Sequence, residues 1–264
     1  MSRYGSYEDQ PILAELYDYV PGYRSRPDID FFVRCCMESG GDIIELGSGT
    51  GRILIPVAEA GCQITGVDLS EFMLSRCREK LEKCPDEIKN RIRLIQGNII
   101  SIDLDRKFDL AIMPFRVFQH LVTVEEQLAC LKNINRHLNG DDRLVFDVFQ
   151  TDLKRINNPA FMNEMEDFSD IDLPDGRRLR RNHRVAAFHP EEQVNEVELI
   201  YYLTDSKGET SRIVQAFPFR YFFRYEMEHL LARAGFKILE VFGDFDRSPL
   251  SGHSPEMIFV TEKT

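Results

Sequence analysis

The chain has 264 residues and 43% of them are hydrophobic, which is enough to fill one α/β core that carries an insertion. Asp and Glu number 44 against 33 Lys and Arg, so the net charge at pH 7 is −11. Such a surface repels polyanions, and we therefore expect no nucleic-acid partner.

The first six residues lack the apolar segment of a secretory signal, and no stretch reaches the roughly 18 consecutive apolar residues that a membrane span needs. We therefore expect a cytoplasmic protein with no membrane partner. The six cysteines include no C-x-x-C pair, and several lie in apolar periodic segments. This usage fits reduced thiols and predicts no metal site.

From about residue 40 to 150, short apolar runs alternate with longer segments of helical period, which is the pattern of βαβ units around a parallel sheet. Strands are predicted at 42–46, 63–68, 92–96, 108–114 and 143–149. Helices are predicted between them at 53–60, 71–84 and 124–137. Ser70 is the predicted N-cap of the second helix.

The pattern changes after residue 149. Alternating runs at 196–204 and 211–223 flank the turn-like Asp205-Ser206-Lys207-Gly208, which predicts an antiparallel hairpin inside a β-rich insertion. A helix is then predicted over 224–234 with Gly235 as its stop, and two more strands at 237–242 and 256–262.

A glycine-rich loop follows the first predicted strand. Asp42-Ile43-Ile44-Glu45-Leu46 runs directly into Gly47-Ser48-Gly49-Thr50-Gly51. A turn of this kind lets a ligand approach the backbone, because no Cβ intervenes. The dinucleotide fingerprint G-x-G-x-x-G would need glycine at position 52, where Arg stands, so the spacing disfavours NAD.

The segment Glu45-Leu46-Gly47-Ser48-Gly49-Thr50-Gly51 resembles motif I of the class I S-adenosylmethionine-dependent methyltransferases, and the likeness extends over most of the chain. The resemblance implies a doubly wound, seven-stranded Rossmann-like parallel sheet with an antiparallel final strand. It also implies S-adenosyl-L-methionine as cofactor and S-adenosyl-L-homocysteine as product.

The same resemblance implies further contacts to the methyl donor. Asp68 stands where the family's carboxylate receives both ribose hydroxyls, and Gly97-Asn98 stands where the family usually has Gly-Asp beside the adenine amino group. Asn98 departs from that pattern, although its amide oxygen can still accept an N–H. The implied donor-binding residues are Tyr23, Arg24, Glu45, Gly47, Ser48, Gly49, Asp68, Leu69, Met73, Gly97, Asn98, Ile99, Met113, Phe115 and Phe118.

The segment after the fourth strand is the candidate for the chemistry. Phe115-Arg116-Val117-Phe118-Gln119-His120-Leu121 lacks the Asn/Asp-Pro-Pro-aromatic motif of DNA amino-methyltransferases. It resembles instead the aromatic-x-x-apolar-x-His-Leu segment of deoxysugar amino N-methyltransferases, which implies that His120 takes the proton of the substrate amine. The alternative is a helix-start histidine that only binds backbone. An unperturbed pKa of about 6.5 would leave much of it neutral at pH 7.

Two other groups of residues have two interpretations each. The segment 16–24 resembles the family's lid, which implies a catalytic contact for Tyr17, whereas Tyr23 and Arg24 could equally be core contacts. The basic run Arg177–Arg184, or Arg220 with Arg224 in an aromatic hairpin, could hold an anionic group of the acceptor. For the run 177–184 the alternative is a solvated hairpin whose charges protect its edge.

Together these inferences predict lid helices at 1–40, an S-adenosylmethionine-binding core at 41–150 and 226–264, and an antiparallel β cap at 151–225 over the acceptor pocket. We expect methyl transfer to a small-molecule acceptor, first to an amine nitrogen and second to oxygen, by a monomer or homodimer. A non-catalytic S-adenosylmethionine-binding protein is the other alternative, because Asn98 and Asn139-Gly140-Asp141-Asp142 both depart from the family pattern.

Overall fold

The computed structural model describes residues 7–152, 154–155 and 158–264. The chain divides into two compact units. One, the small unit, is formed by Met1–Arg24 and Asp152–Tyr221, and the other, the core unit, by Ser25–Thr151 and Phe222–Thr264. The expected lack of a signal segment concerns residues 1–6, which lie outside the described residues. Within the described ranges, no helix is long and apolar enough to cross a bilayer.

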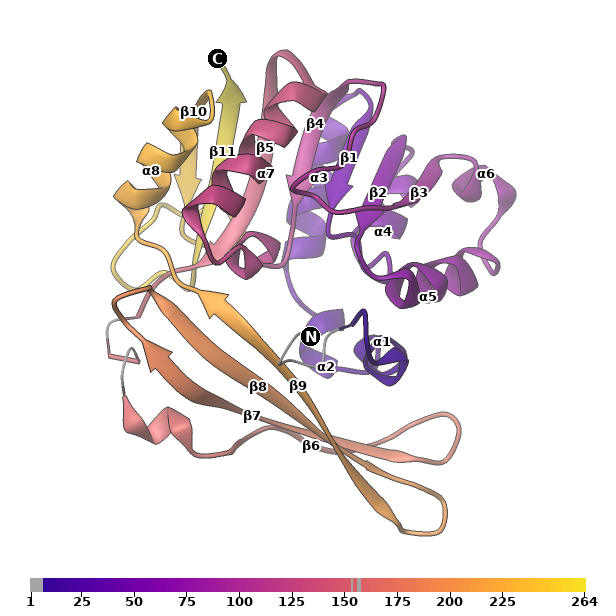
Figure 1. Cartoon of the computed structure of the whole chain (residues 1–264). Helices are drawn as coiled ribbons and strands as arrows, with labels where there is room; N and C mark the ends of the chain where they lie inside the picture. Colours follow the sequence, from indigo (N-terminus) through magenta and orange to yellow (C-terminus); the bar gives the residue numbers. More distant parts are fainter. Residues whose placement is uncertain (1–6, 153, 156–157) are drawn as a thin grey trace. The chain divides into compact units, whose positions relative to one another are not determined.

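The core unit is built on a seven-stranded sheet in the order β10-β11-β5-β4-β1-β2-β3 (Figure 1). Strands β1 to β5 pair in parallel, whereas β11 runs antiparallel to both of its neighbours. The predicted parallel sheet with an antiparallel final strand is therefore confirmed. The strands are β1 (Ile43–Leu46), β2 (Ile64–Asp68), β3 (Ile92–Gln96), β4 (Phe108–Met113), β5 (Leu138–Phe149), β10 (Phe236–Phe242) and β11 (Glu256–Lys263).

Helices cover both faces of this sheet, because alternate strand residues point to opposite faces and both faces are apolar. Leu131 of α7 and Leu231 of α8 belong to one buried cluster, and Phe31 of α3 and Val57 of α4 belong to the other. The helices are α3 (Asp28–Ser39), α4 (Leu54–Glu59), α5 (Glu71–Leu81), α6 (Asp86–Lys89), the 3₁₀ helix η1 (Val117–His120), α7 (Val124–His137) and α8 (Arg224–Arg233).

Capping side chains explain where two of these helices begin. The Ser70 hydroxyl accepts the Met73 N–H at 3.3 Å, so the predicted cap of α5 is confirmed. Thr123 and Glu126 form a reciprocal capping box at the start of α7. The largest difference from a predicted bound is in β5, which begins at Leu138 and includes residues 139–142, with Asp141 at a φ of +64°.

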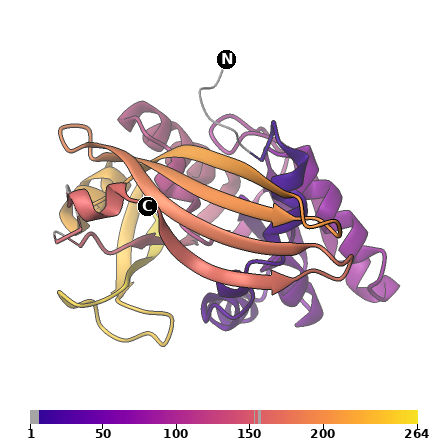
Figure 2. The same ribbon diagram turned by 90° about the horizontal axis from the view of Figure 1, so that it is seen from below.

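The small unit holds a four-stranded antiparallel sheet in the order β6-β7-β8-β9 (Figure 2). The hairpin predicted around residues 205–208 joins β8 to β9 and is confirmed. Strand β7 has neighbours on both sides, so the prediction that Arg177–Arg184 protects a sheet edge is wrong. The strands are β6 (Met165–Asp172), β7 (Arg178–His189), β8 (Val194–Thr204) and β9 (Thr210–Arg220).

Short helices pack on this second sheet and complete the small unit's own core. They are α1 (Pro11–Tyr17), α2 (Pro21–Arg24) and the 3₁₀ helix η2 (Pro159–Met162). Leu13 and Leu16 of α1 are fully buried in one cluster with Leu179 and Tyr201 of the sheet. Helix α3, which the sequence grouped with the N-terminal helices, lies in the core unit.

Candidate functional site

The glycine loop leaves the carboxyl end of β1 and lies against β2. The N–H groups of Gly47 and Ser48 donate to the Val67 carbonyl at 2.8 and 3.0 Å. Gly47, Gly49 and Gly51 have φ values of +74°, +54° and +79°, a region that residues with a Cβ rarely adopt. The backbone of this loop therefore depends on glycine.

The three glycines differ in what surrounds them. A Cβ at Gly47 would lie 2.5 Å from Val117, and one at Gly51 would lie 2.6 Å from Cys77 Sγ. At Gly49 the nearest atom would be the flexible Met73 methyl at 3.2 Å. Protein packing therefore requires glycine at 47 and 51, whereas the backbone at 49 is the part of the loop that is least crowded by protein.

Asp68 ends β2 and holds the loop. Its Oδ2 accepts the Gly49 N–H at 2.7 Å and its Oδ1 accepts the Ser70 N–H at 2.9 Å. These two hydrogen bonds fix the carboxylate, a group type whose two oxygens can each accept more than one hydrogen bond. The next side chain, Leu69, is apolar and 43% exposed, which suits a flat apolar ligand surface.

Glu45 is only 2% exposed, and its Oε2 has no hydrogen-bond partner among the described residues. Burial raises the pKa of Glu45 well above its usual value, while the Arg52 charge lowers it and the charge of Asp68 raises it further. The Ser48 hydroxyl is likewise buried without a partner in this part of the chain. Unsatisfied buried groups cost about 1–3 kcal/mol each, so both are expected to be kept for a polar ligand.

Gly97 and Asn98 follow β3 at the same edge of the sheet. The Gly97 N–H donates to the Asp68 carbonyl at 2.9 Å, which brings this turn beside β2. The Asn98 Oδ1, the predicted acceptor, already accepts the Ile100 N–H at 2.9 Å. One lone pair remains for a ligand N–H, and Ile99 lies partly buried next to it.

Phe115 lies beyond the end of β4, in a turn that the protein holds tightly. Phe115 and Arg116 have φ values of +63° and +64°, and the Phe115 N–H donates to Asp147 Oδ1 at 2.7 Å. The guanidinium carbons of Arg26 and Arg52 lie 4.8 and 4.7 Å from the Phe115 ring centre. Arg116 also lies over this ring, at 5.9 Å, so cation–π contacts hold it in place.

Those cations belong to a buried ion network that sequence reasoning missed. Arg26 donates to Asp147 at 2.9 Å and to Glu256 at 3.0 Å, and Arg52 makes a double hydrogen bond of 2.7 Å to Asp28. The one sequence signal was Asp147, a lone acid near the carboxyl end of an apolar strand. The network fixes the turn from which the segment 117–121 starts.

His120 is the last residue of η1 and is exposed to solvent. The protein packed around the ring lowers the pKa of His120 below its ordinary value, so the imidazole is mostly neutral at pH 7. Met113 and Phe118 are fully buried, and the Phe118 ring packs 5.5 Å from Phe146 and 5.4 Å from Phe222. They support this edge of the sheet, and their contact with a ligand stays a prediction.

The core unit thus brings the predicted residues of β1, β2, β3 and the η1 segment to the carboxyl edge of its parallel strands, where open α/β sheets bind ligands. Tyr17, Tyr23 and Arg24 belong to the small unit. There the Tyr17 and Tyr23 ring centres are 4.8 Å apart, and the exposed Arg24 donates to the Asp18 carbonyl.

The two arginines that the sequence paired belong to different units. Arg220 ends β9 in the small unit and donates to the Glu192 carbonyl at 2.8 Å, whereas Arg224 is the first residue of α8 in the core unit. Arg224 therefore lies in a helix and not in the predicted aromatic hairpin.

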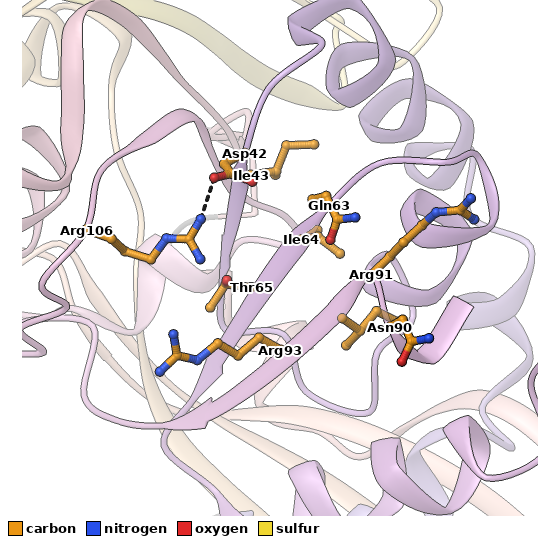
Figure 3. Close-up of a pocket in the computed structure, with 10 residues that line it drawn as sticks. Asp42, Ile43, Gln63, Ile64, Thr65, Asn90, Arg91, Arg93 and Arg106 are labelled. Atoms are coloured by element: carbon orange, nitrogen blue, oxygen red, sulfur yellow. Dashed lines mark hydrogen bonds and ion pairs between the residues drawn. The ribbon is translucent and has the colours of Figure 1, made fainter. Parts of the chain in front are cut away.

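A separate hollow lies at the opposite, amino edge of the parallel strands (Figure 3). Its volume is about 90 Å³, below the roughly 300 Å³ at which small-molecule pockets begin. Arg106 forms an ion pair there with Asp42. Because the glycine loop lies at the carboxyl edge, this hollow is not the predicted donor site.

Three comparisons bear on identity. Residues 43–141 match a family model described as a methyltransferase domain. The chain is 24% identical over 255 residues to a putative methyltransferase of Bacillus subtilis, which covers 96% of each chain. It is 26% identical over 227 residues to the cypemycin N-terminal methyltransferase of a Streptomyces species, covering 85% of this chain and 84% of that one.

Among solved structures, the chain is similar to the sugar N-methyltransferase KedS8 from Streptoalloteichus, with a TM-score of 0.73 and 18% identity over 98% of this chain and 94% of that one. This similarity establishes the fold along almost the whole length. The matched methyltransferase range contains the glycine loop, Asp68, Asn98 and His120. Residues 43–141 are therefore a methyltransferase domain, and the chain has the class I fold of known S-adenosylmethionine-dependent methyltransferases along almost its whole length.

Proposed function

We propose that this enzyme methylates an amine nitrogen of a small molecule and that His120 is its general base. The observation that carries the proposal is the solvent-exposed imidazole of His120, which ends η1 seven residues beyond Met113 at the carboxyl end of β4. The names of the similar proteins support nitrogen as the target, because one acts on a peptide N-terminus and another on a sugar nitrogen.

The donor side of the reaction rests on the core unit. Asp68 would hold the donor's hydroxyls, and Glu45 Oε2 and the Ser48 hydroxyl would supply buried polar atoms that have no partner among the described residues. When bound, S-adenosylmethionine supplies an electrophilic methyl group on a sulfonium. The transfer itself needs no acid, so the protein contributes mainly position.

The acceptor side requires a proton to leave. A nitrogen attacks through its lone pair, so an ammonium must lose one proton before or while the new C–N bond forms. That proton passes to the imidazole of His120, which becomes a cation and later returns the proton to solvent. Only a neutral imidazole can accept it, and His120 is mostly neutral at pH 7.

His120→Asn tests this role. We expect kcat to fall by about 10² to 10⁴, the range for loss of a general base, with donor affinity little changed. S-adenosylhomocysteine release is measured with a panel of amino sugars, simple primary amines and a peptide with a free N-terminus. His229→Asn is the matched control, because His229 is an exposed histidine on α8.

The pH dependence of the methylation rate gives a second test of the role of His120. Because the pKa of His120 is lowered to about 4, the wild-type rate should lose its His120-dependent part only as pH falls through about 4. The variant should lack that acidic limb. If the variant keeps a rate within about threefold of wild type and an unchanged pH profile, His120 is not the general base and has a structural role.

The same panel separates oxygen from nitrogen. A carboxylate acceptor is already deprotonated at pH 7, so its methylation would depend little on His120. Methylation of acids and not of amines would therefore overturn the proposed target atom.

A further inference from the structure

The loop between β3 and β4, residues 97–107, begins with the predicted adenine contacts Gly97 and Asn98 and contains no helix or strand. Its first residues form a tight turn, since the Asn98 carbonyl accepts the N–H groups of Ser101 and Ile102 at 3.0 and 2.8 Å. The rest of its main chain has no strand ladder to hold it. Its position therefore depends on side chains from elsewhere in the core unit.

Helix α7 supplies those side chains. Asn133 Nδ2 donates to the Ile99 carbonyl at 3.0 Å, and His137 Nε2 accepts the Leu104 N–H at 2.9 Å. Asn133 is 6% exposed and His137 is 5% exposed. The two side chains are four positions apart and share one face of the helix, so a rigid element holds the loop at two points.

The Asn133 amide has one orientation. Its Oδ1 accepts the Arg136 Nε–H at 2.7 Å, while its Nδ2 faces the Ile99 carbonyl. A guanidinium can only donate and a carbonyl can only accept, so the reverse placement of oxygen and nitrogen would lose both bonds. Asparagine is a poor helix former and its amide is costly to bury. Its contact with the loop explains its place in α7.

One peptide group connects Asn133 to Asn98. The carbonyl of the Ile99–Ile100 peptide accepts from Asn133, and the N–H of the same peptide donates to Asn98 Oδ1 at 2.9 Å. Because a peptide group is planar, a rotation that releases its carbonyl also turns its N–H. Loss of the Asn133 donor would therefore free the Asn98 amide, which could then present either its oxygen or its NH₂ group to a ligand.

We infer that Asn133 is a positioning residue for the methyl donor. Through the Ile99–Ile100 peptide it fixes the Asn98 amide, and it thereby sets the preference for an amino group over a carbonyl at position 6 of the purine. The inference rests on the proposed function and on the predicted contact between Asn98 and the adenine amino group. Every residue that carries it belongs to the core unit.

Asn135 offers a matched control on the same helix. Its Nδ2 also donates to a backbone carbonyl, that of Gly235, at 2.8 Å. Gly235 follows α8 and lies outside the loop 97–107. Asn133→Ala and Asn135→Ala therefore remove the same side chain and the same kind of hydrogen bond from α7, and only the first releases the Ile99 carbonyl.

Asn133→Asp is a second variant that keeps the size of the side chain. Its carboxylate can still accept from Arg136, but it has no N–H to donate to Ile99. An effect that both Asn133 variants share is therefore due to the missing donor, and either variant alone can decide the test if the other does not fold.

The first test needs no ligand. The enzyme is labelled with ¹⁵N-isoleucine, and the Ile100 amide signal is assigned by its loss in Ile100→Val. Both Asn133 variants should move this signal and speed the exchange of its proton with solvent, because the hydrogen bond to Asn98 is weakened. Asn135→Ala should do neither. An Ile100 signal that stays in place in a folded Asn133 variant overturns the inference.

The second test compares two ligands by calorimetry. They are S-adenosylhomocysteine and S-inosylhomocysteine, which carries a carbonyl in place of the amino group. The wild type should prefer the first ligand, and the Asn133 variants should reduce the ratio of the two Kd values by about 3- to 10-fold, the effect of roughly one hydrogen bond. Asn135→Ala should keep the wild-type ratio.

The outcomes of the second test separate the inference from the proposed function. An unchanged ratio in a folded Asn133 variant, or a wild type that binds the two ligands equally, overturns the inference. A wild type that binds neither ligand overturns the donor site of the proposed function instead, and the Ile100 signal still decides whether Asn133 fixes the turn.

Discussion

Glu45 ends β1 as a buried carboxyl with one oxygen that lacks a partner among the described residues. Burial raises its pKa in the folded state well above the value of about 4.3 in an unfolded chain. The folded protein therefore binds this proton more tightly than the unfolded chain does. The contribution of Glu45 to stability is fully present below about pH 4, and it is lost as pH rises toward the folded pKa.

Glu45→Gln should therefore stabilise the ligand-free enzyme at pH 8, by roughly 1–3 kcal/mol, and should give no such gain at pH 4. The same change should weaken donor binding, because it replaces an oxygen of the buried carboxyl group with an NH₂ group. Thermal unfolding at the two pH values, with calorimetry of S-adenosylhomocysteine binding, measures both effects. Glu59→Gln, on the exposed end of α4, is the control. A gain that is equal at both pH values would show that ionisation of Glu45 is not its cause.

At the scale of the element, two glycines of the loop are expected to have different roles, Gly51 in packing and Gly49 in binding the donor. Gly51→Ala places a Cβ 2.6 Å from Cys77 Sγ, while Gly49→Ala meets only the flexible end of Met73 at 3.2 Å. Both changes also place a Cβ in the left-handed region, at about 1–2 kcal/mol per residue. The two variants therefore differ mainly in the steric clash.

We expect Gly51→Ala to lower the Tm more than Gly49→Ala does, and Gly49→Ala to lose most of its affinity for S-adenosylhomocysteine while it stays folded. Calorimetry and thermal unfolding of the two variants provide the comparison. If Gly49→Ala binds the product as wild type does, the loop backbone at 49 is not in contact with the donor.

Elements with strong local signals were predictable. Strand β3 and helix α7 have the bounds that periodicity predicts, and α7 also carries its capping box in the sequence. Strand β7 was missed because five arginines within 177–184 obscure its alternation. The hydrogen bonds of the Arg181 side chain are made to residues of β6 and α2, which no local pattern indicates. Helix α6 has only four residues, too few for a periodic signal.

The candidate site also contains both residues that a local motif indicates and residues that only long-range contacts bring together. The glycine loop and Asp68 are local motifs, so the sequence indicates them directly. The network beneath Phe115 joins Arg26 to Asp147, 121 positions away, and to Glu256, 230 positions away. No local pattern encodes such pairs, because strand order brings them together. The charges of that network are therefore found only in the folded chain.

At the scale of the whole molecule, each unit is assembled from two separate segments of the chain. The small unit's second segment, Asp152–Tyr221, is inserted between two core residues that are already joined. The Thr151 hydroxyl donates to the Phe222 carbonyl at 2.6 Å, so the two ends of the insertion site are adjacent within the core unit. The residues of the donor site in the core unit all lie outside the insertion.

This geometry predicts that the core unit folds and binds the donor without the small unit. The variant begins at Ser25, joins Thr151 to Phe222 through two or three glycines, and ends at Thr264. Starting at Ser25 avoids exposing Leu13 and Leu16, whose buried partners are removed. We expect a cooperative unfolding transition and S-adenosylhomocysteine binding within about tenfold of wild type, because the glycine loop, Asp68 and Asn98 are all retained. Asp68→Ala in the same variant should remove the binding. A folded core unit that binds no product would show that residues of the small unit belong to the donor site.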